Sequence, residues 1–242
     1  MDQRVIRELA PNGILRAGIN LSNFLLVSGS AENGDPAGVS SDMAKAVAEC
    51  LNASVQYVCY DSPGELAESC DDDEWDICNI GAEPQRAEKI SFTAAYSEIE
   101  ATYLVSSRLD VSTPSDIDRP GIRISVRGGS AYGLWLERNI KHAELVLADS
   151  LDSAFDRFIE EELDVLAGLR PRLLSDAEKI PGSRILEGKF SAVQQAIGTP
   201  RRNQLAASWM KKFVEDSKRS GFVAGLIEKH RVEGLSVAPL AN

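Results

Sequence analysis

The chain has 242 residues, 43% of them hydrophobic, and its 26 basic and 37 acidic residues give a net charge of -11. A nucleic-acid partner requires a basic surface that neutralises phosphates, so this charge balance excludes that class of function. No hydrophobic run approaches the length of a membrane span, which predicts a soluble globular protein with one large domain or two modest ones.

Residues 1–9 form a short amphipathic segment and not a signal peptide, because no apolar stretch follows the basic start. If the sequence is complete, we therefore expect a cytoplasmic protein. The spacing of the four cysteines lacks any C-x-x-C pair and does not favour a zinc or redox site. We expect buried thiols, with a disulfide as the alternative, at Cys50, Cys59, Cys70 and Cys78. Because the chain has only two histidines, we expect no histidine-based metal centre. We also expect no other metal site and no cofactor.

The first hundred residues predict strands and helices in alternation. Strands are expected at residues 14–19, 55–60 and 75–80, and a helix at 64–70. Another helix is expected to begin at a cap formed by Ser41 and Asp42, with one buried face at Met43, Val47 and Cys50. This β-α-β-α-β order predicts a parallel sheet with helices on its faces.

A second unit of the same kind follows. Strands are expected at 122–126, 145–148 and 165–168, with helices at 131–139 and 151–161. The last third predicts a strand at 192–198 and helices at 203–217 and 221–230. The first of these helices places Leu205, Trp209 and Phe213 at i, i+4 and i+8, a stripe that we expect to face a sheet.

Two such units predict two lobes, each with a mixed, mainly parallel sheet flanked by helices. We expect lobe 1 at residues 1–102 and 198–242 and lobe 2 at 103–197. No Pro/Gly linker separates the lobes, so strands near 101–105 and 193–198 become the expected connections. Two crossing strands make a hinge, and a ligand cleft is expected between the lobes.

Arg86 stands just after the third expected strand, behind the turn formed by residues 81–85. Its guanidinium keeps its charge and presents a planar fork of donors that matches a carboxylate. A salt-bridging surface arginine is the alternative. Arg86 is therefore a candidate anchor for a small anion.

Several segments resemble family 3 of the periplasmic solute-binding proteins, the amino-acid type. They occur in the same order as in that family along nearly the whole chain. Proteins of this family have the type II periplasmic-binding-protein fold. The matching segments are residues 14–19, 38–44, 75–77, 84–86 with Phe92, Thr93 and Tyr96, 128–130, 163–167 and 220–222. The resemblance implies a two-lobed α/β protein that closes over a small ligand for uptake by an ABC transporter or for sensing.

Carried over residue by residue, the resemblance implies that Arg86 binds the ligand's carboxylate. It also implies backbone N–H donors in the second lobe at Gly129, Ser130 and Ala131, where a helix start favours an anion; a plain capped turn is the alternative. In the first lobe it implies donors near Gly81 and Ala82, although the turn is two residues shorter than the family pattern and Glu83 replaces a threonine. Asn23, Phe24 and Asn79 are further ligand-binding candidates, and one of Gln194 and Gln195 could face the cleft.

Where the family has an aspartate for the ligand's ammonium group, this chain has Leu169, followed by Arg170. An unpaired ammonium in a desolvated cleft costs roughly several kcal/mol. If Arg170 points inward, we expect a carboxylate ligand without that amino group, with two acidic groups as one form of it. Alternatively, Arg170 turns to solvent and Glu83 or Asp42 takes the ammonium.

The sequence therefore predicts a non-enzymatic binding protein for an amino-acid-like or other organic anion. We expect a monomer that binds a small carboxylate, with an ABC transporter permease as a further partner and a periplasmic location by family resemblance. The alternative is an enzyme on the same fold, similar to cyclohexadienyl dehydratase, with Glu83 as the acid. A regulator's effector domain is disfavoured because no helix-turn-helix precedes residue 14.

Overall fold

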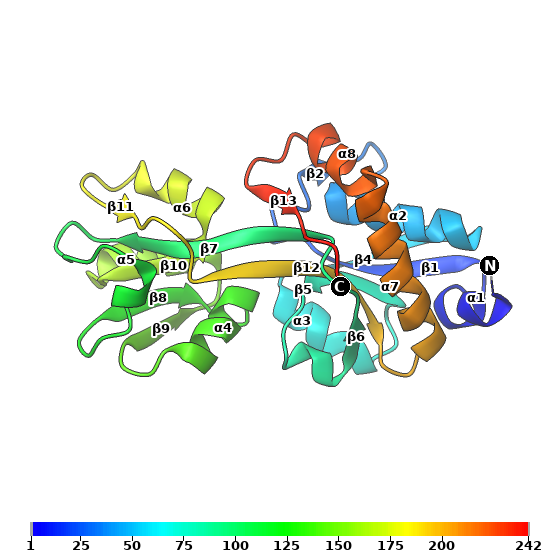
Figure 1. Ribbon diagram of the computed structural model, residues 1–242, viewed down its shortest axis with the longest axis horizontal. Coiled ribbons are helices and arrows are strands. Elements are labelled where there is room, and N and C mark those ends of the chain that lie inside the picture. Colours follow the sequence, from blue (N-terminus) through cyan, green and yellow to red (C-terminus); the bar gives the residue numbers. More distant parts are fainter. Residues whose placement is uncertain (1, 242) are drawn as a thin grey trace. The chain divides into compact units, whose positions relative to one another are not determined.

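The computed structural model describes residues 2–241, and the chain divides into two compact units (Figure 1). Unit 1 is Met1–Glu98 with Gln194–Asn242, and unit 2 is Ile99–Val193. Strands β7 (Ser97–Val105) and β12 (Ser191–Pro200) each contain one border between the units. The borders expected from sequence fall on the same two strands.

The sheet of unit 1 has the strand order β4, β1, β5, β12, with β6 paired to β12. These strands are β1 (Ile14–Asn20), β4 (Ser54–Tyr60), β5 (Ile77–Gly81) and β6 (Ile90–Phe92). β1 is parallel to β4 and β5, whereas β12 is antiparallel to β5 and β6. Because parallel strands end at one edge, the carboxyl ends of β1 and β5 lie side by side.

Helices cover this sheet, and short strands complete the unit. The helices are α1 (Gln3–Leu9), α2 (Val39–Leu51), α3 (Pro63–Glu68) with the 3-10 turn η1 (Ser69–Asp71), α7 (Gln204–Arg219) and α8 (Phe222–Lys229). The short strands are β2 (Gly29–Ser30), β3 (Pro36–Ala37) and β13 (Leu235–Val237). On one face of the sheet a core forms from Leu66, Cys70, Trp75, Cys78, Ile80 and Ile90.

Helix α2 begins earlier than predicted. Its cap is Gly38 at φ 154, a backbone conformation that favours glycine, and the N–H of Ser40 donates to the Leu26 carbonyl at 3.1 Å. The predicted cap at Ser41 and Asp42 is therefore wrong, because the chain already turns into the helix at the glycine.

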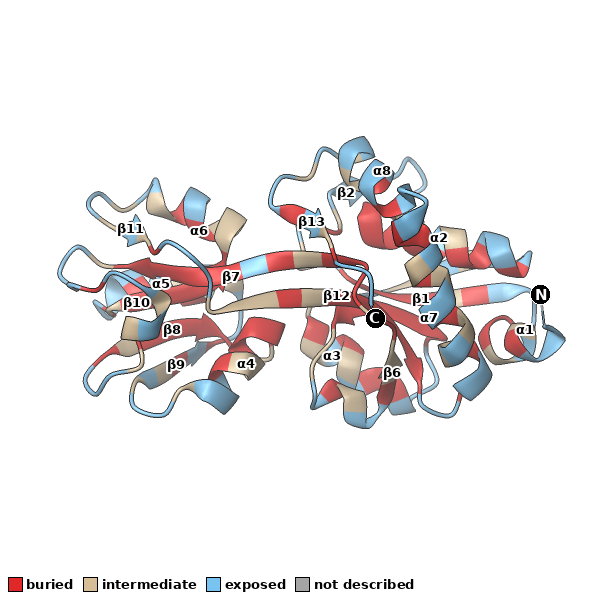
Figure 2. Cartoon of the chain, viewed as in Figure 1, coloured by how far each residue is buried: buried red, intermediate tan, exposed pale blue. Residues whose placement is uncertain are grey.

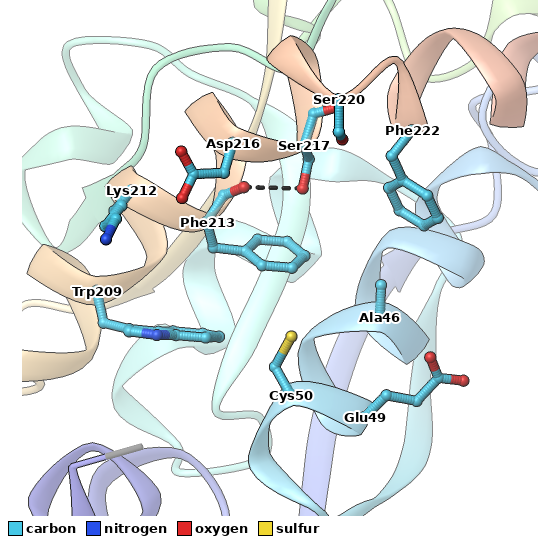
Figure 3. Close-up of a pocket in the computed structure, with 10 residues that line it drawn as sticks. All are labelled: Ala46, Glu49, Cys50, Trp209, Lys212, Phe213, Asp216, Ser217, Ser220 and Phe222. Carbon is cyan, nitrogen blue, oxygen red and sulfur yellow. Dashed lines mark hydrogen bonds between the residues drawn. The ribbon is translucent and has the colours of Figure 1, made fainter.

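The buried face of α7 is also not the predicted one. Ala206, Met210 and Val214 are fully buried, whereas Leu205 is 37% exposed. Figure 2 colours the helix by burial. Trp209 and Phe213 stack with ring centroids 5.5 Å apart and line a surface groove with Phe222 and Cys50 (Figure 3). Two apolar stripes share this helix, and the one with smaller side chains packs inward.

Unit 2 has the strand order β7, β10, β8, β9, with β11 paired to β7. Its strands are β8 (Arg123–Arg127), β9 (Glu144–Ala148), β10 (Val165–Leu169) and β11 (Arg184–Ile185). β8 is parallel to β9 and β10, and β7 is antiparallel to β10. The core of this unit includes Leu104, Val146, Phe158, Leu166 and Leu173.

The helices of unit 2 are α4 (Ala131–Asn139), α5 (Leu151–Glu160) and α6 (Arg170–Ala177), and a 3-10 turn, η3, spans Pro114–Asp116. Helix α6 was not predicted from the sequence. Pro171 lies in its first turn, where the missing N–H of proline breaks no helical hydrogen bond. The proline thus marks a helix start and not a loop.

All four cysteines are free thiols; Cys70 and Cys78 are buried, but Cys50 and Cys59 are exposed. The expectation of burial is thus wrong for Cys50, the thiol in the surface groove of α7, and for Cys59 on the outermost strand of the sheet. Among residues 2–241, no group of three or more His, Cys, Asp and Glu side chains is arranged to hold a metal ion. Over the same residues, every helix is too short or too polar to cross a membrane.

Candidate functional site

Arg86 lies at the carboxyl end of β5 in unit 1. It opens the 3-10 turn η2 (Arg86–Glu88), and its Nη1 donates to the carbonyl oxygen of Gly81 at 2.7 Å. The side chain is only 6% exposed. Burial lowers the pKa of the Arg86 guanidinium to about 10, and attraction to the Glu83 carboxylate opposes that shift. Arg86 therefore remains a buried cation at neutral pH.

The short turn before Arg86 forms a backbone hydrogen bond with the neighbouring strand β12. The Ala82 N–H donates to the Gln194 carbonyl at 2.8 Å, so pairing with β12 extends beyond β5. The expectation that Ala82 offers this N–H to a ligand is wrong for that reason. Gly81 is the last residue of β5, opposite Gln195, and its carbonyl holds Arg86. Glu83 is half-buried, and its carbonyl accepts from Ala87 at 2.9 Å.

Two buried amide side chains lie near the same glycine. Asn79 is 2% exposed and Gln195 is 3% exposed. Within residues 2–241, neither the Oδ1 and Nδ2 atoms of Asn79 nor the Oε1 atom of Gln195 has a hydrogen-bond partner. Orphaned buried polar atoms are rare and call for an explanation. The sequence suggested Asn79 as a ligand-binding candidate and left open whether Gln194 or Gln195 faces the cleft. The register with β5 puts Gln195 on the same face of the sheet as Asn79.

Asn23 and Phe24 lie in the loop after β1. The Asn23 Oδ1 accepts from the Leu25 N–H at 3.2 Å, and the Asn23 carbonyl accepts from Val27 at 2.8 Å. Its amide oxygen thus shapes the loop. Phe24 is 39% exposed, so its ring is accessible to a stacking ligand.

In unit 2, the predicted anion-binding turn is the start of α4. Gly129 has φ +66, and the buried Ser130 is the helix cap. Its Oγ accepts from the Gly133 N–H at 3.0 Å and donates to the Arg127 carbonyl at 2.7 Å. The hydroxyl is therefore committed to the helix, while Ala131 opens the first turn, whose N–H groups have no carbonyl partner inside the helix. This end of α4 favours an anion.

Arg127 is a second buried arginine that sequence reasoning missed. It is 7% exposed and ends β8 directly before the Gly128-Gly129 turn. Burial raises the pKa of Tyr132 to about 12, while a hydrogen bond with Ser130 and the Arg127 charge act in the opposite direction. The sequence contained a signal for it, since Arg127 follows an expected strand as Arg86 does. The start of α4 is thus more cationic than predicted.

Arg170 begins α6 and does not present an unpaired cation. Its Nε donates to Glu100 Oε2 at 2.9 Å and its Nη2 donates to the Gly188 carbonyl. Lys189 lies 3.5 Å from the same carboxylate, and the bond from Arg170 holds the pKa of Glu100 below its usual value. Because β10 pairs Leu169 with Ala101, Glu100 lies beside Arg170 across the sheet. The hypothesis of a cation added by an inward-pointing Arg170 must therefore account for this pairing, and no local sequence signal links residues seventy positions apart.

Asp42 was the alternative partner for a ligand's ammonium group. Its Oδ2 accepts from Lys229 Nζ at 2.6 Å and lies 2.7 Å from His230 Nε2. This carboxylate ties the first turn of α2 to the end of α8, so the alternative that assigns Asp42 to the ligand is wrong.

Comparison with known proteins gives one family. The family model for bacterial extracellular solute-binding proteins, family 3, matches residues 18–233. A search of curated protein sequences gives no match.

Solved structures share the fold at low sequence identity. The solute receptor for L-cysteine of Neisseria gonorrhoeae has a TM-score of 0.76 and 18% identity, covering 98% of this chain and 99% of its own. A mutant of ArgBP from T. maritima has a TM-score of 0.73 and 21% identity, covering 95% and 100%. An ancestral amino acid-binding protein, a precursor of cyclohexadienyl dehydratase, has a TM-score of 0.72 and 19% identity, covering 93% and 98%.

Proposed function

Because this chain belongs to family 3 of the bacterial extracellular solute-binding proteins and has their two-lobed type II fold, we propose that it binds a small carboxylate ligand. Its lobes close over the ligand for uptake by an ABC transporter permease or for sensing. The observation that carries the proposal is the buried guanidinium of Arg86, fixed 2.7 Å from the Gly81 carbonyl. A carboxylate matches the planar donor fork of this guanidinium, which can bind it through two parallel hydrogen bonds.

Unit 2 supplies the other contacts with the carboxylate in this proposal. They come from backbone N–H groups at Gly129, Ser130 and Ala131, at the dipole-positive end of α4. The positive charge of the buried Arg127 beside this turn adds to the attraction for an anion.

The ligand in this proposal does not need an α-amino group. Leu169 ends β10 with an apolar, buried side chain where the family places a carboxylate. Glu100 lies nearby, but its charge is already matched by Arg170 and Lys189. An ammonium group would therefore enter this part of unit 2 without an uncommitted carboxylate, at a cost of several kcal/mol if fully desolvated, to order of magnitude.

An enzyme on the same fold is the second candidate, with Glu83 as its general acid. The structural similarity to a precursor of cyclohexadienyl dehydratase is the reason to retain the enzyme as a candidate. The family whose model matches this chain is one of solute-binding proteins, which argues against it. Conversion of a substrate by the purified protein that is lost in Glu83→Gln would establish the enzyme.

The binding proposal is tested with carboxylates and their methyl esters. Native mass spectrometry of the protein as purified identifies any retained small molecule. A thermal-shift panel then compares organic acids, amino acids and the corresponding esters, because a ligand that binds only the folded protein raises its melting temperature. We expect stabilisation by at least one acid and by none of the esters. Equal stabilisation by an acid and its ester would contradict a carboxylate anchor.

A further inference from the structure

We propose that Asn79 and Gln195 form a subsite for a neutral carboxamide group, so that the ligand is a small carboxylate carrying a primary amide. This inference rests on the proposed function and specifies its ligand class. It starts from three orphaned atoms, the Oδ1 and Nδ2 of Asn79 and the Oε1 of Gln195, which have no hydrogen-bond partner within the described chain.

The two amides lie on one face of the sheet. In the antiparallel pairing of β5 with β12, Gly81 is opposite Gln195 and Asn79 is opposite Ile197. Residues opposite each other share a face, as do residues two apart along a strand. Asn79 and Gln195 are therefore diagonal neighbours, whose Cα atoms lie roughly 7–8 Å apart in such a pair. Across that spacing, one small polar group can reach both side-chain amides.

Gly81 places this pair beside the carboxylate anchor. It lies opposite Gln195, two residues after Asn79, and its carbonyl accepts the 2.7 Å hydrogen bond from Arg86. As a glycine it adds no side chain to the space near the amides. A ligand whose carboxylate meets Arg86 can therefore reach the amide pair with a group only a few bonds away.

The orphaned atoms match a primary carboxamide atom by atom. Asn79 Oδ1 and Gln195 Oε1 are two acceptors, and Asn79 Nδ2 is a donor. A carboxamide supplies two N–H donors and one carbonyl acceptor, so it satisfies all three atoms. A carboxylate supplies acceptors only and would leave both amide oxygens unpaired. A buried site discriminates strongly against a ligand that leaves its polar atoms unpaired.

Charge also favours a neutral group. Asn79 and Gln195 are uncharged, and the charges of Arg86 and Glu83, which follow Gly81 in the chain, attract each other. A buried ammonium or second carboxylate would therefore receive no counter-ion from the two amides. A carboxamide avoids that desolvation penalty.

The test compares amides with their acids by isothermal titration calorimetry at neutral pH. The pairs are L-glutamine with L-glutamate, L-asparagine with L-aspartate, succinamate with succinate, and glutaramate with glutarate. We expect the amide of at least one pair to bind at least about tenfold more tightly than its acid, since a site that pairs polar groups rejects analogues that leave them unpaired. In Asn79→Leu and Gln195→Met this preference should fall below about threefold.

Two readouts separate a ligand subsite from a structural role. Asn79→Leu keeps the number and branching of the side-chain heavy atoms and removes the orphaned polar atoms, so the ligand-free variant should melt at the wild-type temperature or above it. Gln56→Met makes the same change as Gln195→Met at an exposed position of β4 and should keep the amide preference.

Each other outcome decides against the proposal. The carboxamide subsite is overturned if an acid binds more tightly than its amide, if the two bind equally, or if the preference for the amide survives in both variants. The carboxylate-binding function would stand in each of these cases. A lowered melting temperature in ligand-free Asn79→Leu assigns the amide to the fold. Absence of binding by every amide and acid, and by every other organic acid of the thermal-shift panel, overturns both.

Discussion

Arg86 and Gly81 are joined by a 2.7 Å hydrogen bond from Nη1 to the carbonyl oxygen, which fixes the guanidinium at the carboxyl end of β5. The bond orients the charge before any ligand arrives, so little side-chain entropy remains to be lost on binding. The arginine thus acts as a preorganised anchor in the proposed function.

Replacing Arg86 with lysine tests the anchor. Lysine keeps the positive charge but loses the planar fork, and we expect the ligand found for the wild type to bind about 100-fold more weakly. Arg86→Ala should abolish binding. Calorimetric titration measures both, with Arg7→Ala on the exposed face of α1 as the control. Wild-type affinity in Arg86→Ala would place the ligand elsewhere.

The cap of α4 provides a second test. Loss of the Ser130 hydroxyl removes its bond with the Gly133 N–H and leaves that group unsatisfied, so Ser130→Ala should lower the free energy of unfolding by about 1 kcal/mol. Because the same turn is proposed to bind the carboxylate, ligand affinity should fall as well.

Ser150 gives the matched control for that effect. It caps α5 in the same unit, and its Oγ accepts from the Ser153 N–H at 3.0 Å. Ser150→Ala should lower stability by a similar amount, about 1 kcal/mol, without changing ligand affinity. Equal losses of affinity in the two variants would mean that helix capping, and not anion binding, accounts for the result at Ser130. Urea unfolding and titration of the same samples measure the two quantities.

Sequence alone gave the alternation of strands and helices, because apolar periodicity and capping residues are local signals. The α4 helix at Ala131–Asn139 has the bounds that its Gly-Gly-Ser turn predicted. The pairing of Arg170 with Glu100 could not be predicted, since it depends on the register of β10 with β7. The orphaned amides of Asn79 and Gln195 likewise depend on which residues of β5 and β12 face each other.

The Asp42 carboxylate makes stability depend on acid pH. Burial raises its pKa, but hydrogen bonds from Lys229 and His230 outweigh burial and hold the pKa below the usual value. A carboxyl group with a depressed pKa stabilises the fold above its unfolded pKa of about 3.9, and this contribution is lost as pH falls through the folded value. Asp42→Asn should therefore reduce stability at pH 7 by about 1 kcal/mol.

That difference should disappear at low pH. In urea unfolding between pH 7 and pH 3, the stability difference between wild type and Asp42→Asn should shrink below about pH 4, as pH falls toward the depressed pKa at which the folded carboxyl takes up its proton. A constant difference over the whole range would show that packing at Asp42, and not its charge, stabilises the contact with α8.

The two apolar stripes of α7 predict different costs of truncation. Met210 is fully buried, so Met210→Ala should lower the free energy of unfolding by about 2–5 kcal/mol. Leu205 is 37% exposed and its truncation should cost less than about 1 kcal/mol. Urea unfolding of both variants checks the assignment. A larger loss of unfolding free energy in Leu205→Ala than in Met210→Ala would instead support the stripe predicted from the sequence, which contains Leu205.

Gly38 is the position where the start of α2 depends on a missing side chain. Its φ of 154 suits glycine, and a Cβ atom there would lie 2.8 Å from the Cα of Val27, closer than side chains tolerate. Gly38→Ala should therefore destabilise the protein by about 2 kcal/mol or more, because the added Cβ would meet backbone atoms, which cannot give way as the end of a flexible side chain can. Gly29→Ala is the control, since nothing lies within 4 Å of a Cβ atom built there. Equal stability of the two variants in urea would show that α2 can begin at Ser41, as its capping residues predict.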